Sequence, residues 1–165
     1  MSAPALRPFL PSDTPTLAAI FKAAVDELTG EDYTSDQRGA WACLVDDEVD
    51  FAARLAARLT LVATMDGEPV GFAALLGVEA IDFLYVLPSA TGNGVATLLC
   101  DALERLATAR GGVKLTVDAS DTAEPFFQKR GYVAQSRNTR VIADEWLANT
   151  TMTKQIAAPA SETLQ

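Results

Sequence analysis

The chain has 165 residues, of which 49% are hydrophobic and 21% charged, so its composition predicts one globular domain with its own core. Acidic residues outnumber basic ones by 22 to 13, and the net charge of −9 disfavours nucleic acid and anionic lipid as partners. Because the chain contains no histidine, it has no imidazole base and no serine–histidine pair, and no metal site is expected.

The two cysteines and the apolar runs of the chain indicate where in the cell the protein is expected. Cys43 and Cys100 fit no metal-binding spacing, and each is expected to be a small buried apolar residue. No apolar run is long enough to span a membrane, and the first residues do not resemble a signal peptide. A cytoplasmic protein is therefore expected.

The first third of the chain is predicted to be mostly helical. A short strand is expected at residues 5–9, and Ser12 or Asp13 can cap the helix that follows. Shorter helices are expected at residues 33–45 and 46–58. The first long helix ends at Gly30, and its apolar residues recur at helical spacing: Leu17, Ile20, Phe21, Ala24, Val25 and Leu28.

The middle of the chain alternates strands with one clear helix. The β-rich runs at residues 59–64 and 70–76 flank an Asp-Gly pair, which predicts a hairpin. A further strand is expected at residues 80–86. The spacing of apolar residues predicts a helix over 94–110, which the glycines at 111–112 terminate.

The last third is predicted as strand, helix and two strands. A strand is expected at residues 113–117, and Asp121 with Glu124 has the spacing of a capping box for a helix that ends at Gly131. Two strands are expected at residues 132–137 and 150–156. The order of elements predicts an α/β (α+β) domain over residues 1–157, built on a mixed sheet of about six or seven strands with helices on both faces, followed by a flexible tail at 158–165.

The most informative segment is Ile81–Ala96, where a strand runs into a glycine-bearing loop that opens a helix. The first amides of a helix lack intrahelical acceptors, and glycine lets a ligand approach the backbone closely, so this arrangement suits a phosphate or pyrophosphate. The segment lacks the lysine of a nucleotide-hydrolysing loop and the third glycine of a dinucleotide fingerprint. From the glycines alone, a simple turn and helix cap is an equal alternative.

The complete segment resembles motif A of the GNAT superfamily of acyl-CoA-dependent N-acetyltransferases. Val86 and Pro88 match its V-x-P, and Gly94 and Ala96 match the glycine-bearing turn that follows, whereas Thr91 stands where Gln or Arg is usual. In this family the loop amides bind the pyrophosphate of coenzyme A. Loss of the longer side chain at Thr91 leaves those amides in place.

A second segment, Ser120–Tyr132, resembles the downstream motif of the same family. Ala123, Gly131 and Tyr132 match it. Ser120 replaces the asparagine that usually contacts coenzyme A, and Phe127 replaces the tyrosine that often protonates the leaving thiolate.

The resemblance implies a GNAT-like fold in which two strands splay near Val86 and admit the pantetheine arm of acetyl-CoA, which serves as cosubstrate. It also implies a small-molecule or peptide amine as the other substrate, and a homodimer is common in the family. The residues that the resemblance places against acetyl-CoA are Tyr85, Val86, Thr91, Gly92, Asn93, Gly94, Val95, Ala96, Thr97, Ser120, Ala123, Phe126 and Phe127.

The predicted chemistry is direct attack of the amine on the thioester. Asp82, four residues before Val86 and expected on the face of Leu84, is the candidate base, and a structural salt bridge is the alternative role for it. The acid is left open between Tyr33 and water, because Phe127 has no proton to donate and strand alternation places Tyr85 on the face opposite Asp82.

The acceptor amine is expected to meet the region between the first helix and the first hairpin. There the candidate pocket residues are Tyr33, Gln37 and Trp41, while the acidic run at 46–48 is more typical of a solvated helix start. The leading interpretation is an N-acetyltransferase. A non-catalytic acyl-CoA-binding or regulatory module of the same fold, and a different α/β enzyme with a phosphate-bearing ligand, stay open.

Overall fold

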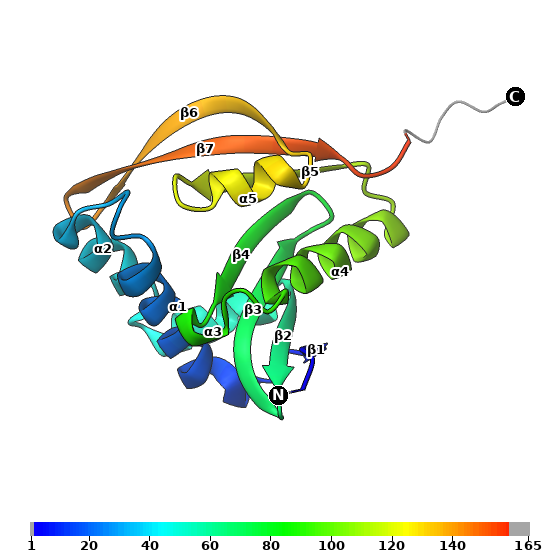
Figure 1. The fold of residues 1–165 in the computed structure, drawn as a ribbon, viewed down its shortest axis with the longest axis horizontal. Helices are drawn as coiled ribbons and strands as arrows, with labels where there is room; N and C mark the ends of the chain where they lie inside the picture. The colour runs from blue at the N-terminus through cyan, green and yellow to red at the C-terminus, as the bar shows by residue number, and fades with distance from the viewer. Residues whose placement is uncertain (1, 159–165) are drawn as a thin grey trace, which may run out of the picture.

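The computed structural model describes residues 2–158, which form one mixed sheet with helices on both faces (Figure 1). The strands lie in the order β1-β2-β3-β4-β5-β7-β6, and only the β4–β5 pair is parallel. The predicted fold class and strand number are confirmed. The strands are β1 (Ala5–Pro8), β2 (Leu59–Met65), β3 (Glu68–Leu76), β4 (Ala80–Val86), β5 (Lys114–Ser120), β6 (Val133–Ile142) and β7 (Glu145–Gln155).

The helices divide the core into two layers. On one face of the sheet, Leu99, Leu103 and Phe127 pack under α4 and α5. On the other face, Phe21 and Phe51 pack under α1 and α3. No helix within residues 2–158 is long and apolar enough to cross a bilayer. The helices are α1 (Thr14–Leu28), α2 (Ser35–Ala42), α3 (Glu48–Ala56), α4 (Val95–Ala109) and α5 (Glu124–Lys129), with short 3-10 turns at Pro11–Asp13, Cys43–Val45 and Pro88–Ala90.

The C-terminal hairpin is much longer than predicted. Strands β6 and β7 pair from Val133↔Thr153 to Ile142↔Glu145, and Ala143 and Asp144 turn the chain with φ values of 47° and 67°. This two-residue turn carries no glycine, so the usual hairpin signal is absent. Most of β6 is exposed on both faces, so its sequence lacks the alternation of a half-buried strand. The tail expected at 158–165 lies outside the described residues apart from its first residue.

Three local predictions are wrong. Asp121 and Glu124 do not form a capping box, because α5 starts at Glu124 and the Asp121 carboxylate pairs with Arg137. Asp13 occupies the N-cap position of α1, but its carboxylate accepts from Arg7 and from the Leu10 amide, so it provides no side-chain cap. The thiol of Cys43 is exposed, whereas that of Cys100 is buried as expected.

The parallel pair β4–β5 opens soon after it forms. The two strands pair only at Ala80↔Thr116 and Ile81↔Val117. Beyond this point β4 stays with β3 and β5 stays with β7, so the strands diverge toward Val86 and Ser120. Figure 1 shows β4 and β5 separating in this way between α4 and the β6–β7 hairpin. The predicted splay near Val86 is thus confirmed.

Candidate active site

A cleft of about 540 Å³ lies where β4 and β5 separate. One wall comes from the end of α1, with Tyr33 and Trp41 beside it, and the floor comes from the two diverging strands. The start of α5 and the turn end of the β6–β7 hairpin complete the lining. Segments that range from α1 to β7 therefore meet around one hollow.

The diverging strands leave backbone groups free along the cleft. The Leu87 amide donates to the Val70 carbonyl of β3, so alternation along β4 turns the N–H groups of Leu84 and Val86 toward β5. At this level β5 has already moved away. Two strand amides are thus available to a ligand that lies along β4.

The loop after β4 has the geometry of an anion site. Gly92 and Gly94 have φ values of 83° and 78°, and a Cβ placed on either would meet nothing within 4 Å. Gly94 caps α4, whose first three amides have no intrahelical acceptor. The side chains of Thr91 and Asn93 bind the carbonyls of this same turn, which leaves the outer side of the loop to its backbone.

The other residues predicted to meet acetyl-CoA occupy three kinds of position. Tyr85, Val86, Ser120, Ala123 and Phe127 line the cleft. Val95, Ala96 and Thr97 form the first turn of α4 with their amides at its open end. Phe126 does not line the cleft, and its ring lies against the Arg130 guanidinium instead.

Asp82 lines the cleft but not on the expected face. A β-bulge shifts the register between Ala74↔Phe83 and Leu75↔Ile81, leaving Asp82 as the extra residue. Its carboxylate accepts a 2.5 Å hydrogen bond from Nε of Arg58, which follows α3. The bulge therefore turns Asp82 toward the α1–α3 face, which Phe83 and Tyr85 also occupy. The prediction that Asp82 shares the face of Leu84 is wrong.

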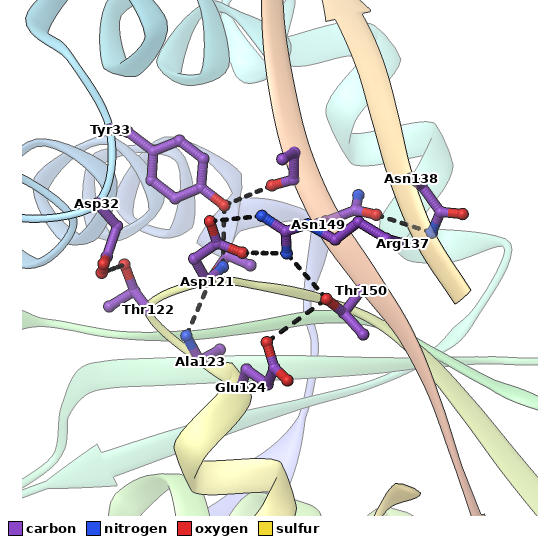
Figure 2. A network of polar contacts seen from close by, with 12 residues as sticks. Asp32, Tyr33, Asp121, Thr122, Ala123, Glu124, Arg137, Asn138, Asn149 and Thr150 are labelled. Carbon is purple, nitrogen blue, oxygen red and sulfur yellow. Dashed lines mark hydrogen bonds and ion pairs between the residues drawn. The ribbon is translucent and has the colours of Figure 1, made fainter. Parts of the chain in front are cut away.

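Tyr33 is buried, with 5% of its surface exposed, and its hydroxyl joins three segments (Figure 2). The hydroxyl donates to the Ala148 carbonyl of β7 at 2.6 Å and accepts from the Asp121 amide at 2.9 Å. Burial raises the pKa of Tyr33, so the phenol stays neutral. Its single proton is held by Ala148, and the side chain links the α1–α2 loop to the ends of β5 and β7.

The aromatic wall of the cleft is made by Trp41 and Tyr85. The Trp41 indole N–H lies 3.4 Å from the Tyr85 hydroxyl, and its ring packs edge-on against Tyr33. Burial raises the pKa of Tyr85 to about 12. Gln37, in contrast, does not line the cleft, because its amide donates to the Trp146 carbonyl and its oxygen caps α2. Gln37 therefore links α2 to the β6–β7 hairpin.

The short turn between β5 and α5 is held from both sides (Figure 2). The Thr122 hydroxyl donates to Asp32 and the Tyr33 hydroxyl accepts from the Asp121 amide on the α2 side. On the hairpin side, Arg137 makes two hydrogen bonds to the Asp121 carboxylate and a third to the Thr150 hydroxyl. This turn carries Ser120, whose hydroxyl accepts from the Ala123 amide, so the polar network fixes part of the cleft lining.

Sequence reasoning missed the cleft residues of the hairpin. Arg140, Leu147 and Asn149 all line the hollow, and so does Asp118 of β5. The first three fall in the segment that the sequence leaves between two predicted short strands. Their position depends on a glycine-free turn, which gave no signal. No group of three or more carboxylate or cysteine side chains suited to a metal occurs within residues 2–158.

Comparison with known proteins agrees with this architecture. Residues 30–156 match the family model described as an acetyltransferase (GNAT) domain. The protein YafP of Escherichia coli (strain K12), named as an uncharacterized N-acetyltransferase, is 34% identical over 144 residues, which make up 87% of this chain and 91% of that protein.

Two crystal structures extend the comparison. A protein from Rhodopseudomonas palustris, described as a GCN5-related N-acetyltransferase and as a class-II aminotransferase, is 60% identical, with a TM-score of 0.92 over 94% of this chain and 97% of that one. The PaiA N-acetyltransferase of Thermoplasma acidophilum, solved in complex with coenzyme A, has a TM-score of 0.78 over 94% and 99% of the two chains. At 16% identity it supports the fold alone.

Proposed function

Because this chain belongs to the GNAT family of acetyltransferases, we propose that it transfers an acetyl group from acetyl-CoA to the amine of a small molecule or peptide by direct attack. One observation carries the proposal. The cleft between β4 and β5 reaches Val86, which shortly precedes the loop that opens α4, and it also contains an aromatic wall and the carboxylate of Asp82. The reaction would need the first region for the cofactor and the second for the amine.

The two ends of the cleft have different tasks in this proposal. The cofactor side comprises the loop at residues 91–94, the first turn of α4, the free edges of β4 and β5, and the start of α5. Its backbone amides would hold the pyrophosphate and the pantetheine arm. The acceptor side comprises Tyr33, Trp41, Tyr85, Asp82 and the turn end of the hairpin, and would hold the amine.

Asp82 is the proposed base. As the amine nitrogen bonds to the thioester carbonyl, its proton passes to the Asp82 carboxylate, directly or through one water. The C–S bond then breaks, and an amide and a thiolate form. Arg58 holds the carboxylate through Oδ2, and Oδ1 accepts no hydrogen bond from any residue within 2–158, so it can take the proton. The amide N–H of Val86 would stabilise the negative oxygen of the intermediate.

The thiolate is proposed to take its proton through solvent, which receives the proton that Asp82 accepted from the amine, so that Asp82 is again a carboxylate. A phenol with a pKa of about 12, as at Tyr85, would give its proton to a thiolate of pKa about 8.5 only at a cost of about 5 kcal/mol. The pKa of Tyr33 is also raised, and its proton is bound by Ala148. Tyr33, predicted as catalytic, is therefore proposed to act by holding the cleft in shape.

The test is titration calorimetry with acetyl-CoA, with desulfo-CoA and ADP as comparators. We expect micromolar binding of acetyl-CoA, with ADP weaker by at least about tenfold, because the pantetheine arm would add contacts along β4. Equal binding of ADP and acetyl-CoA would contradict a pantetheine groove. Release of free thiol from acetyl-CoA with members of a broad amine panel would then separate an enzyme from a non-catalytic acyl-CoA-binding module.

A further inference from the structure

Arg140 is a cation without a protein partner on the acceptor side of the cleft. It lines the cleft from β6, yet its guanidinium makes no hydrogen bond or ion pair with any residue within 2–158. Other arginines that face neighbouring elements are engaged: Arg58 binds Asp82, Arg130 binds Asp101 and Glu104, and Arg137 binds Asp121. Arg140 is exposed, and in a chain of net charge −9 it places an unpaired positive charge at the edge of the cleft.

The hairpin fixes where Arg140 points. Arg140 lies directly opposite Leu147 in the β6–β7 register, so the two side chains project from the same face of the hairpin. Leu147 is buried and lines the cleft, as does Ile142 two residues beyond Arg140. The same hairpin is anchored to the acceptor side by Tyr33 through Ala148 and by Gln37 through Trp146. Arg140 is thereby held over the acceptor side rather than over the loop at 91–94.

The surroundings of Arg140 suit an anion that is part of a larger molecule. Burial dominates the raised pKa of Tyr85, the Trp41 hydrogen bond and the Arg140 charge act to lower it, and the Asp82 charge acts to raise it. The Tyr85 hydroxyl therefore feels both Arg140 and Asp82. Arg140 and Asp82 line the same cleft as Trp41 and Tyr85, and a cleft with one positive and one negative side chain matches a ligand that carries an amine and an anionic group.

We infer that the acceptor is an amine that also carries a carboxylate, with Arg140 as the residue that selects it. The Arg140 guanidinium would bind the carboxylate through paired N–H···O bonds, and the amine would face Asp82 and the thioester. This inference rests on the proposed function and adds a substrate class to it. Arg140 is a specificity residue here, because it contacts the part of the acceptor that does not react.

The experiment compares amines that differ only in a carboxylate against a carboxamide. The pairs are glycine, β-alanine, γ-aminobutyrate and L-phenylalanine, each with its amide. Rates are measured as thiol release from acetyl-CoA and are divided by the concentration of unprotonated amine, because the amine pKa differs within each pair. For at least one pair we expect the carboxylate to be preferred by about tenfold or more in kcat/KM, because a charge-assisted pair is lost with the amide.

Three variants separate the role of Arg140 from general damage. Arg140→Ala should remove the preference for the carboxylate, and Arg140→Glu should reverse it toward the amide, while both keep the wild-type KM for acetyl-CoA. Arg110→Ala is the matched control, since Arg110 is also exposed and free of hydrogen bonds and ion pairs within residues 2–158 but follows α4 away from the cleft. It should leave the preference unchanged.

The outcomes distinguish this inference from the proposed function. Thiol release with amines, but an equal or greater rate with the amides, would overturn the inference and leave the acetyltransferase assignment intact. A raised KM for acetyl-CoA in Arg140→Ala would also overturn it, because Arg140 would then bind the cofactor. If no amine reacts, the proposed function fails. Because the inference rests on the proposed function, it fails in that case as well.

Discussion

The two sides of the cleft present different kinds of group to a ligand, backbone amides on one side and side chains on the other. The cofactor side is largely backbone: free strand amides at Leu84 and Val86, positive-φ glycines in the loop at 91–94, and the open end of α4. The acceptor side consists of side chains, among them Asp82, Tyr85 and Arg140, which come from separate elements. A backbone site recognises a constant ligand, whereas a side-chain site can be changed residue by residue. The difference indicates where a common cofactor and a particular acceptor would each be recognised.

The sharpest way to break this comparison is to change Asp82 to Asn. The substitution keeps the shape of the side chain but removes its capacity to accept a proton, so we expect kcat to fall by about a hundredfold to ten-thousandfold with acetyl-CoA binding unchanged. Steady-state kinetics and calorimetry measure the two effects. Asp50→Asn, which removes the exposed Asp50–Arg54 pair on α3, is the control and should be nearly neutral. Weakened acetyl-CoA binding in Asp82→Asn would contradict the separation of the two sides.

The reciprocal test alters the cofactor side at Gly94. Gly94→Val places a β-branched residue at a φ of 78°, which forces the loop and the first amides of α4 to move. We expect acetyl-CoA affinity to fall by about tenfold to a hundredfold, since each amide hydrogen bond lost to a charged pyrophosphate would cost about 1.5–3 kcal/mol. Gly111→Val carries the same backbone strain at the other end of α4, where φ is 92°, and should preserve binding. Equal losses in both variants would show that strain alone is responsible.

The link between the two sides is tested at Tyr33. Tyr33→Phe leaves the buried Ala148 carbonyl and the Asp121 amide without their partner, so we expect the free energy of unfolding to drop by about 1–3 kcal/mol. Denaturant unfolding gives this value. Tyr85→Phe removes only a 3.4 Å contact with Trp41 and should cost less. A larger loss in Tyr85→Phe than in Tyr33→Phe would argue that Tyr33 does not hold the cleft together.

The smallest expected effect lies in the scaffold behind the cofactor side. Burial acts to raise the pKa of Glu104, but hydrogen bonds from Lys154, Arg130 and Tyr132 outweigh it and hold the pKa below the ordinary 4.5. A lowered folded-state pKa stabilises the fold above the unfolded value, and this stability is lost as the pH falls through the folded value. Unfolding measured against pH should therefore show declining stability below about pH 4.5.

The contribution of Glu104 itself is isolated by Glu104→Gln. This variant should be less stable than wild type by about 1 kcal/mol at neutral pH, with a shallower decline on acidification. Glu68→Gln, at an exposed and unpaired position within the described chain, should follow the wild-type curve. An unchanged acid limb in Glu104→Gln would assign the decline to other carboxylates, such as Asp13, whose pKa Arg7 also holds down.

Much of the fold followed from local patterns. The helical spacing of apolar residues in α1 and α4 and the Asp-Gly turn between β2 and β3 contributed to the predicted fold class. The opening of the sheet near Val86 was implied by the resemblance of the surrounding segment to motif A of the GNAT family. The predicted cofactor residues Tyr85, Val86, Ser120, Ala123 and Phe127 do line the cleft, because backbone sites are encoded by continuous segments whose geometry is set by glycine, proline and strand length. Their role in binding acetyl-CoA stays a prediction.

What the sequence by itself determined is therefore the α/β framework and the backbone half of the candidate site. Only the tertiary structure decided the rest: the bulge that turns Asp82 toward Arg58, the two partners of the Tyr33 hydroxyl, and the glycine-free hairpin that carries Arg140 over the cleft. The physical reason is the separation in sequence over which the interactions act. Helix spacing and turn chemistry act over a few residues, whereas the acceptor side joins side chains more than a hundred residues apart, and their pairing exists only once the sheet has formed.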